Sequence, residues 1–319
     1  MSAAALSLAS PAKLNLFLEV LGRRADGYHE LETVMQTVSL CDTLLFFDNT
    51  SGIEVTTDAA AIPGGPANLA YRAAALFFRH TGRRAGIRIA IRKRIPAGGG
   101  FGGGSSNAAA ALVGLDHICG TRLAPAVLMD LGAQIGSDVP FFIRGGTAVC
   151  RGRGERMEPV ACTGTFHYLV VAPPVHCPTP AVFGHLAGTG SYPDRPRHPE
   201  AVLHALQMGD IMGLGREVFN RLEDPATGCL PALAAFRAQL DASGCGRFTM
   251  TGSGSAFFQV LASRAAGAAI RDRLLSTRAI RETGVFLCEG NGVGARGIPP
   301  DRGRRGRDPA GRRGCRPAG

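Results

Sequence analysis

A glycine-rich segment is the part of this 319-residue chain whose residue types most directly indicate chemistry. Six glycines occupy positions 98–100 and 102–104 around Phe101, and Ser105, Ser106 and Asn107 follow. Glycine permits positive φ and close approach to a ligand, so successive N–H groups can converge on phosphate oxygens. A helix that begins directly afterwards adds free N–H groups and a positive dipole end. The segment therefore predicts a phosphate-binding loop rather than a flexible linker.

Residues outside the glycines distinguish the known kinds of phosphate loop. Gly98, Gly100 and Gly103 match the GxGxxG spacing, but the dinucleotide-binding version needs an acidic residue about 20 positions later, at the end of the next strand. Asp116 lies 13 residues past Gly103, inside a predicted helix. A Walker P-loop requires a lysine directly after the loop, and none is present here. The sequence also lacks the His-Arg-Asp and Asp-Phe-Gly motifs of protein kinases. Rossmann, P-loop and protein-kinase sites are therefore excluded.

Hydrophobic periodicity predicts the elements that position this loop. Alternation over residues 13–21 predicts a half-buried strand with Lys13 and Asn15 on one face. Asn68 predicts the N-cap of a helix that reaches about residue 80 and ends at Gly82. Further strands are expected at 43–48, 52–56 and 88–92, with helices at 108–118 and about 124–131.

A second domain is predicted beyond residue 155. We expect it to begin with a strand at 167–172 and to contain a disordered loop near 189–199. Helices are expected around 200–220 and 231–242, followed by a strand–loop–strand over 247–261 built on Thr251-Gly252-Ser253-Gly254.

The net charge of +10 invites a nucleic-acid-binding interpretation, but the charge is unevenly distributed. Residues 291–319 hold eight arginines and two aspartates, a net +6, which leaves +4 for the preceding 290 residues. This Gly/Arg/Pro-rich tail has too few apolar groups to fold, and we expect it to be disordered. The rest is typical of a globular enzyme: 45% of the residues are hydrophobic, and no run approaches the roughly 20 apolar residues of a membrane span.

The nine cysteines do not indicate a metal site. No two lie within ten residues of each other, and neither CxxC nor HExxH occurs, so no metal ligands are predicted. The N-terminus has no basic region and no long apolar run, which argues against a secretory signal. We therefore expect buried free thiols and a cytoplasmic protein.

Three motifs in order carry a family resemblance: residues 11–16 (Pro-Ala-Lys-Leu-Asn-Leu), residues 96–106, and Thr251–Gly254. In this the chain resembles the GHMP kinase superfamily of small-molecule kinases. Residues 24–31 and 136–142 are most similar to the branch whose alcohol acceptor carries a cytidine diphosphate group. The resemblance covers about residues 8–288.

The resemblance implies an α+β fold of two domains with the active site in the cleft between them. The N-terminal, ATP-binding domain (1–158) would resemble ribosomal protein S5 domain 2, the C-terminal domain (159–290) would be ferredoxin-like, and the tail would span 291–319. Family members usually end in a strand and a Gly-x-x-x-x-Pro-Leu sequence. Here residues 285–288 run into the tail, which leaves the completeness of the final strand open.

The resemblance also implies a catalytic pair. Asp138 would accept the proton of the acceptor hydroxyl, and Lys13 would keep Asp138 ionised and stabilise charge on the transferring group. Each has a simpler interpretation. Asp138 would serve as the N-cap of a short helix before Pro140, and Lys13 as a solvated lysine at a strand end.

ATP-binding residues follow by family position. They include Asn68, Lys93 and the whole loop, with Ser105 or Ser106 near Mg²⁺ or the β-phosphate. The loop residues are Pro96, Ala97, Gly98, Gly99, Gly100, Phe101, Gly102, Gly103, Gly104, Ser105, Ser106 and Asn107. Asn68 has a purely structural alternative as an N-cap.

A cytosine-bearing acceptor needs aromatic faces and hydrogen bonds to the base edge, so Tyr28 and Phe183 are predicted to stack and His29 to contact the edge. Asn15, Thr179 and Gly252 are placed with the polyol and diphosphate. Core packing is the alternative for Phe183, and an ordinary surface histidine is the alternative for His29.

The implied reaction is ATP-dependent phosphorylation of the 2-hydroxyl of a cytidine-diphosphate-linked methylerythritol, in isoprenoid precursor synthesis. One alternative is another GHMP kinase, acting on mevalonate or homoserine. A second, of a different class, is an RNA-binding protein that uses the basic tail. The expected partner is the small-molecule substrate, with no nucleic acid and no membrane. The sequence does not determine the oligomeric state.

Overall fold

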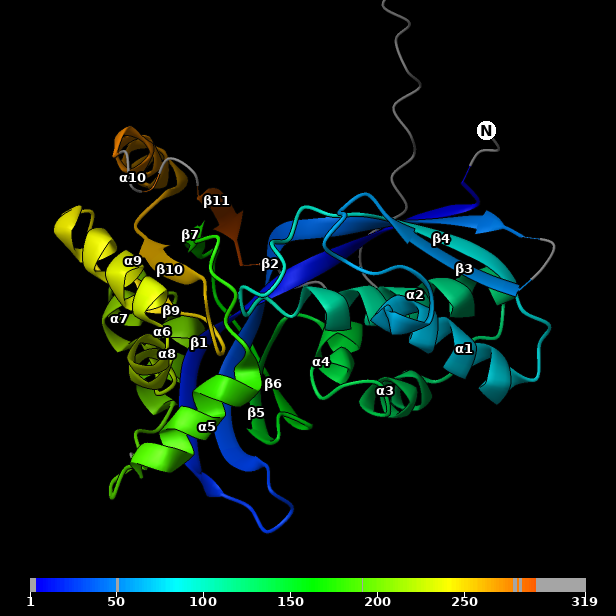
Figure 1. The fold of residues 1–319 in the computed structure, drawn as a ribbon, viewed down its shortest axis with the longest axis horizontal. Coiled ribbons are helices and arrows are strands. Elements are labelled where there is room, and N and C mark those ends of the chain that lie inside the picture. The colour runs from blue at the N-terminus through cyan, green and yellow to red at the C-terminus, as the bar shows by residue number, and fades with distance from the viewer. Residues whose placement is uncertain (1–3, 50–51, 191, 278–279, 281–282, 291–319) are drawn as a thin grey trace, which may run out of the picture.

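The computed structural model describes residues 4–49, 52–190, 192–277, 280 and 283–290. Within these residues one sheet has seven strands, in the order β3-β4-β2-β1-β8, with β5 paired to β2 and β6 paired to β5 (Figure 1). The strands are β1 (Leu6–Arg23), β2 (His29–Asp48), β3 (Gly52–Thr57), β4 (Gly86–Arg92), β5 (Thr147–Gly152), β6 (Arg156–Val160) and β8 (Phe219–Asn220). The strand expected at 43–48 is therefore the end of the 20-residue β2.

Helices from the first half of the chain cover one face of this sheet (Figure 1). They are the 3-10 turn Gly65–Ala67, α1 (Leu69–Thr81), α2 (Gly103–Cys119), α3 (Pro125–Ala133) and α4 (Val139–Arg144). Phe46 and Ile89 of the sheet share a buried core with Phe77, Leu112 and Phe141 of these helices. The helices predicted near 68–80, 108–118 and 124–131 are confirmed. Helix α2 begins at Gly103, earlier than expected. Its first turn consists of small residues without an apolar pattern, so hydrophobic periodicity could not predict it.

The strand predicted at 13–21 is part of β1, but it is buried on both faces rather than half-buried. Leu14, Leu16 and Phe17 form a second core with Tyr168 and Phe258 of another sheet. Lys13 and Asn15 share a face as predicted, but a register shift between Asn15 and Phe17 interrupts the alternation, and the exposure expected for one face is wrong, because both faces are buried. Lys13 and Asn15 are buried as well, against Phe101 of the glycine-rich segment and Thr251 of the second domain.

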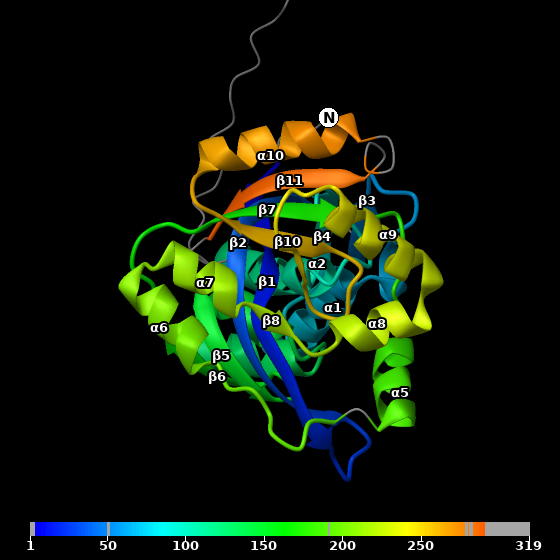
Figure 2. The same cartoon turned by 90° about the vertical axis from the view of Figure 1, so that its left-hand side faces the viewer.

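The second sheet has the ferredoxin-like arrangement that the resemblance implied. Its order is β11-β7-β10-β9, and all neighbours are antiparallel. Figure 2 shows it beneath α10 (Arg264–Ser276). The strands are β7 (His167–Ala172), β9 (Thr249–Met250), β10 (Phe257–Leu261) and β11 (Gly284–Glu289). If these four strands are numbered 1 to 4 along the chain, their order across the sheet is 4-1-3-2. The final strand is present and ends next to an isolated bridge between Val38 and Gly290.

Two predictions for the second domain are wrong. The helix expected over 200–220 is two helices, α6 (Glu200–Met208) and α7 (Ile211–Glu217), separated because Gly209 adopts φ +70° and Asp210 caps α7 through the Gly213 N–H. The loop expected to be disordered near 189–199 is ordered where it is described: α5 (Thr179–Thr189) extends into it, and the Arg197 N–H donates to Glu19 at 3.0 Å.

The remaining helices of this domain are α8 (Glu223–Cys229) and α9 (Pro231–Ala242), the second of which confirms the helix expected over 231–242. The division at residues 158 and 159 stays a prediction, and β6 runs across it. The tail at 291–319 lies outside the described residues.

Among the described residues the cysteines are free thiols, as expected, but only half of them are buried: Cys150, Cys177, Cys245 and Cys288. Cys162 is exposed, and the others are half-buried. None of the described helices combines the length and apolar character needed to cross a membrane.

Candidate active site

The glycine-rich loop is held by contacts with the third motif. Gly98, Gly100 and Gly102 all adopt positive φ, and a Cβ added to Gly100 would lie 2.2 Å from the Thr251 carbonyl oxygen. The N–H groups of Ser255 and Ala256 donate to the carbonyls of Gly98 and Gly99, each at 3.3 Å. The flexible-linker alternative is therefore wrong, because the loop is packed against residues about 150 positions away.

Lys13 lies in the floor of the site, between the glycine loop and the third motif. Its N–H donates to the Phe101 carbonyl at 3.1 Å, and its Nζ donates to Asn15 Oδ1. Both side chains are buried, and Asn15 is held in turn by Thr33 and Thr251. Burial lowers the pKa of Lys13, while the nearby Asp138 carboxylate favours the charged form. The structure thus places Lys13 and Asn15 on one face, as predicted, and excludes a solvated strand-end lysine.

Asp138 occupies the N-cap position of α4, but its side chain makes no capping hydrogen bond. It is half-buried and faces a cavity of about 330 Å³ that it shares with Lys13, Asn15, Thr179 and Gly252. An N-cap that leaves its carboxylate uncommitted gains little for the helix. The carboxylate is instead available to a group in the cavity, close enough to Lys13 to affect the pKa of that amine.

A pocket of about 410 Å³ lies against the glycine loop and shares Gly100 and Gly102 with the Lys13–Asp138 cavity. Its wall includes Asn68, Lys93, Asn107 and the loop residues 96–105. The free N–H groups of the α2 N-terminus start at this wall, so the pocket suits an anion. Asn68 is also the N-cap of α1: its Oδ1 accepts from the Ala70 N–H at 2.9 Å. The structural interpretation of Asn68 is therefore confirmed, and contact with a nucleotide stays a prediction.

A buried polar network supports the floor of this pocket. Asp42, which is fully buried, pairs with Lys93 Nζ and accepts hydrogen bonds from Asn107 Nδ2 at 3.0 Å and from the N–H groups of Arg94 and Ile95. Asp42 thereby holds the chain where β4 enters the glycine loop. It was missed in the sequence, although a single acidic residue inside an apolar strand is a recognisable signal.

The two candidate serines are not equivalent. Ser105 lines the pocket against the glycine loop, whereas the Ser106 hydroxyl is fully buried and accepts a hydrogen bond from Ser10 Oγ at 2.7 Å. Only Ser105 therefore presents its side chain to a bound phosphate or ion. Among the described residues no three His, Cys, Asp or Glu side chains form a metal site. One carboxylate and one hydroxyl fit an Mg²⁺ ion that is held mainly by substrate phosphates and water, which is how Mg²⁺ is often bound.

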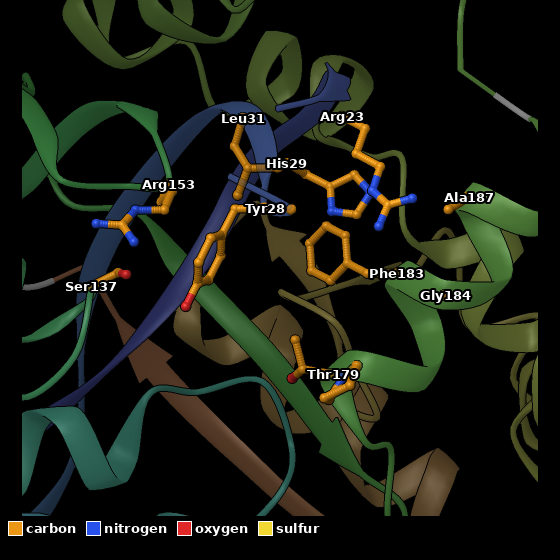
Figure 3. Close-up of a pocket in the computed structure, with 12 residues that line it drawn as sticks. Arg23, Tyr28, His29, Leu31, Ser137, Arg153, Thr179, Phe183, Gly184 and Ala187 are labelled. Atoms are coloured by element: carbon orange, nitrogen blue, oxygen red, sulfur yellow. The ribbon is translucent and has the colours of Figure 1, made fainter. Parts of the chain in front are cut away.

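A third, larger pocket of about 650 Å³ opens beyond the cavity and has an aromatic wall (Figure 3). The rings of His29 and Phe183 lie 4.7 Å apart, and His29 Nε2 lies 2.9 Å from the Tyr192 hydroxyl. Burial and the Arg23 charge lower the pKa of His29, which keeps the imidazole neutral at neutral pH. Tyr28 is 57% exposed and stands on the opposite side of the opening. The pocket thus exposes aromatic faces of Tyr28, His29 and Phe183 to a ligand.

This arrangement brings together the residues predicted to bind the acceptor. Phe183 is half-buried and lines the pocket, but it also packs against a buried core of the second domain, so its stacking on a base stays a prediction. His29 contacts Phe183 and Tyr192 and is not an isolated surface histidine. Thr179 Oγ1 lies 2.7 Å from Ser253 Oγ, where the pocket meets the cavity. Sequence reasoning missed Arg23, Arg153 and Tyr192, which come from the end of β1, from the β5–β6 turn and from the loop expected to be disordered.

Family models match both halves of the chain: the GHMP kinases N terminal domain at residues 68–146 and the GHMP kinases C terminal domain at residues 202–279. A protein of Moorella thermoacetica named 4-diphosphocytidyl-2-C-methyl-D-erythritol kinase is 40% identical over 273 residues, which cover 85% of this chain and 95% of that one. The protein of the same name from Pelotomaculum thermopropionicum is 40% identical over 79% of this chain and 87% of its own.

Solved structures agree with this assignment. A crystal structure of 4-(cytidine 5'-diphospho)-2C-methyl-D-erythritol kinase has a TM-score of 0.73 at 36% identity and covers 90% of this chain and 100% of its own. The mevalonate kinase of L. major, at 18% identity and a TM-score of 0.68, covers 92% of this chain and 100% of its own and shares the fold. The chain belongs to the 4-diphosphocytidyl-2-C-methyl-D-erythritol kinase family of the GHMP kinases.

Proposed function

We propose that this protein transfers the γ-phosphoryl group of ATP to the 2-hydroxyl of 4-diphosphocytidyl-2-C-methyl-D-erythritol, a step in isoprenoid precursor synthesis. The observation that carries this proposal is that the cavity lies between the two pockets. The Lys13–Asp138 cavity shares residues with the glycine-loop pocket on one side and with the aromatic pocket on the other. A phosphoryl donor and a cytidine-bearing acceptor can therefore meet at these two side chains.

The chemistry requires positioning and charge stabilisation more than covalent catalysis. Asp138 accepts the proton of the 2-hydroxyl while the hydroxyl oxygen attacks the γ-phosphorus. The bond between the γ-phosphorus and the β,γ-bridging oxygen breaks, which releases ADP. Lys13, buried beside the cavity, stabilises negative charge on the transferring group. The glycine-loop N–H groups and the α2 N-terminus bind the phosphates that remain on ADP.

Mg²⁺ fits the residues present if the phosphates of ATP supply most of its oxygen ligands. Ser105 is the hydroxyl on the pocket wall that would contact the ion, with Asp138 across the cavity. When bound, the ion neutralises charge on the triphosphate. The protein residues then need only orient the donor and the acceptor.

Specificity for a cytidine-bearing acceptor comes from the aromatic pocket. His29 and Phe183 provide a face for stacking, and the neutral His29 ring provides a hydrogen-bonding edge. Mevalonate and homoserine have no aromatic ring to fill this pocket of about 650 Å³. The pocket therefore favours the cytidine-bearing substrate over those of other GHMP kinases.

A coupled assay of ADP release over a panel of acceptors tests the proposal. With ATP and Mg²⁺ present, we expect turnover with 4-diphosphocytidyl-2-C-methyl-D-erythritol and background rates with mevalonate and homoserine. Turnover of either of the latter two in preference would overturn it. The RNA-binding alternative depends on residues 291–319, outside the described residues, and stays a prediction: steeply salt-dependent RNA affinity lost on truncation after Gly290 would support it.

A further inference from the structure

We propose that Arg153 binds the diphosphate in the middle of the acceptor and so sets the distance between the bound base and the reacting hydroxyl. This inference rests on the proposed function, because it takes the acceptor to be a cytidine diphosphate ester. It assigns a role to a residue of the β5–β6 turn that none of the three sequence motifs contains.

Arg153 lines both the aromatic pocket and the Lys13–Asp138 cavity. The aromatic pocket and the Lys13–Asp138 cavity have four lining residues in common: Leu31, Arg153, Thr179 and Phe183. The acceptor is linear, with its base in the aromatic pocket and its alcohol in the cavity, so its middle must pass these four side chains. That middle is a diphosphate with about two negative charges. Arg153 is the charged member of the shared set.

The guanidinium of Arg153 is available for such a ligand. Within the described residues it forms no ion pair, whereas its neighbours Arg151 and Arg156 both do. Asp26 is close enough for the Arg153 charge to contribute to lowering its pKa, but that carboxylate is already paired with Arg24 at 3.2 Å. The Arg153 guanidinium carbon lies 4.8 Å from the centre of the Tyr28 ring, over its face.

The turn that carries Arg153 is built to hold it at this place. Gly152 and Gly154 on either side adopt positive φ, and the Arg153 N–H donates to Glu155 Oε2 at 2.5 Å. A Cβ at Gly154 would lie 4.0 Å from Asp138 Oδ1, so the turn stands beside the catalytic carboxylate. In Figure 3, Arg153 and Arg23 lie on opposite sides of the pocket, and of the two only Arg153 also reaches the cavity.

A guanidinium suits this role because its planar set of N–H donors can bind two phosphate oxygens at once. Such contacts would restrain the diphosphate in both position and direction. Arg153 therefore acts as a positioning and affinity residue for the acceptor, while Asp138 and Lys13 act on the reacting atoms.

Titrations of cytidine diphosphate and of cytidine into the full-length protein test the proposal. In Arg153→Met, which keeps an unbranched side chain without charge, we expect the Kd of cytidine diphosphate to rise about 10- to 100-fold, the effect of losing charge-assisted hydrogen bonds. The Kd of cytidine should be unchanged, because cytidine has no diphosphate. In the kinase assay the KM of the acceptor should rise by a similar factor, and the KM of ATP should not change.

Arg156→Met is the matched control, since Arg156 lies on the same hairpin, outside the pockets, and pairs with Glu30. It should leave both titrations unchanged. An equal loss of cytidine and cytidine diphosphate affinity in Arg153→Met would overturn the proposal, because Arg153 would then support Tyr28 rather than the diphosphate. An unchanged Kd of cytidine diphosphate would also overturn it. Failure of the wild type to bind either ligand would instead overturn the proposed function, and this inference with it.

Discussion

The two substrate pockets on either side of Lys13 and Asp138 are built in opposite ways. The nucleotide-side pocket is lined mainly by one continuous segment, residues 96–105 with Lys93 and Asn107 next to it, and by a second short segment, residues 62–69. The acceptor-side pocket takes side chains from the β1–β2 turn, the β5–β6 turn and α5. Backbone N–H groups dominate the first, and aromatic and guanidinium side chains dominate the second.

The difference follows from what each pocket must recognise. Phosphates are bound well by backbone N–H groups at a helix N-terminus, which one short segment can supply. A base needs faces and edges at separate positions, which no single turn supplies. Changes in the two pockets should therefore affect different kinetic constants: the KM of ATP on one side and the KM of the acceptor on the other.

The largest effect is expected at the cavity that belongs to neither pocket alone. Asp138→Ala should lower kcat by about 10²–10⁴, the usual contribution of a general base, with the Kd of ATP nearly unchanged. Single-turnover kinetics and ATP titration measure the two quantities. Asp130→Ala, at an exposed position of α3, is the control. Near-normal turnover in Asp138→Ala would remove Asp138 from the role of base.

On the nucleotide side, Gly100→Ala should impair ATP binding. The added Cβ would lie 2.2 Å from the Thr251 carbonyl oxygen at φ +78°, and such strain and overpacking together cost about 2–5 kcal/mol. We expect the KM of ATP to rise at least about tenfold.

Cytidine binding should not change in the same variant, as measured by titration. Gly188→Ala is the matched control, because nothing lies within 4 Å of a Cβ at this helical position. If Gly100→Ala weakened cytidine binding as much as ATP binding, the two pockets would not be separable.

On the acceptor side, Phe183→Ala should raise the KM of the acceptor about 5- to 150-fold and leave the KM of ATP unchanged, since stacking on an aromatic side chain contributes about 1–3 kcal/mol per base. Steady-state kinetics with each substrate varied in turn measure this. Phe47→Ala, an aromatic side chain of β2 that lines neither pocket, is the control. A change in the KM of ATP alone would contradict the assignment of Phe183 to the acceptor pocket.

The smallest effect concerns the protonation of His29. Burial and Arg23 both disfavour the imidazolium, so the pKa of His29 lies below its ordinary value of 6.5. Arg23→Gln removes one of these causes and leaves burial, so the pKa should rise toward that value. The acid limb of kcat/KM for the acceptor should move to higher pH, by less than about one unit. Movement of this limb to lower pH would contradict the assignment.

Local signals in the sequence predicted some elements well. Asn68 caps the N-terminus of α1 and Gly82 its C-terminus, as expected, because caps act through hydrogen bonds within the element itself. Gly209 and Asp210 offered the same kind of signal for the break between α6 and α7, and it was overlooked.

Other features depend on contacts that no local pattern contains. Leu14 and Leu16 of β1 pack with the four-stranded sheet, whereas Lys13 and Asn15 are buried against Phe101 and Thr251. Asp42 matters because Lys93 and Asn107 converge on it. Arg153 is one of 35 Lys and Arg residues, and only its place between two pockets distinguishes it.

The sequence by itself determined the phosphate-binding loop, the face that Lys13 shares with Asn15, and the family. The first two depend on backbone conformation and side-chain period, which act over short stretches of chain, and the family is recognised from three short motifs and their order along the chain. Only the tertiary structure decided that Ser105 rather than Ser106 faces the glycine-loop pocket, that the Asp138 side chain does not cap its helix, and that Arg153 lines both the aromatic pocket and the Lys13–Asp138 cavity. Those outcomes depend on which surfaces meet when the two domains pack together, and packing is set by residues far apart in the chain.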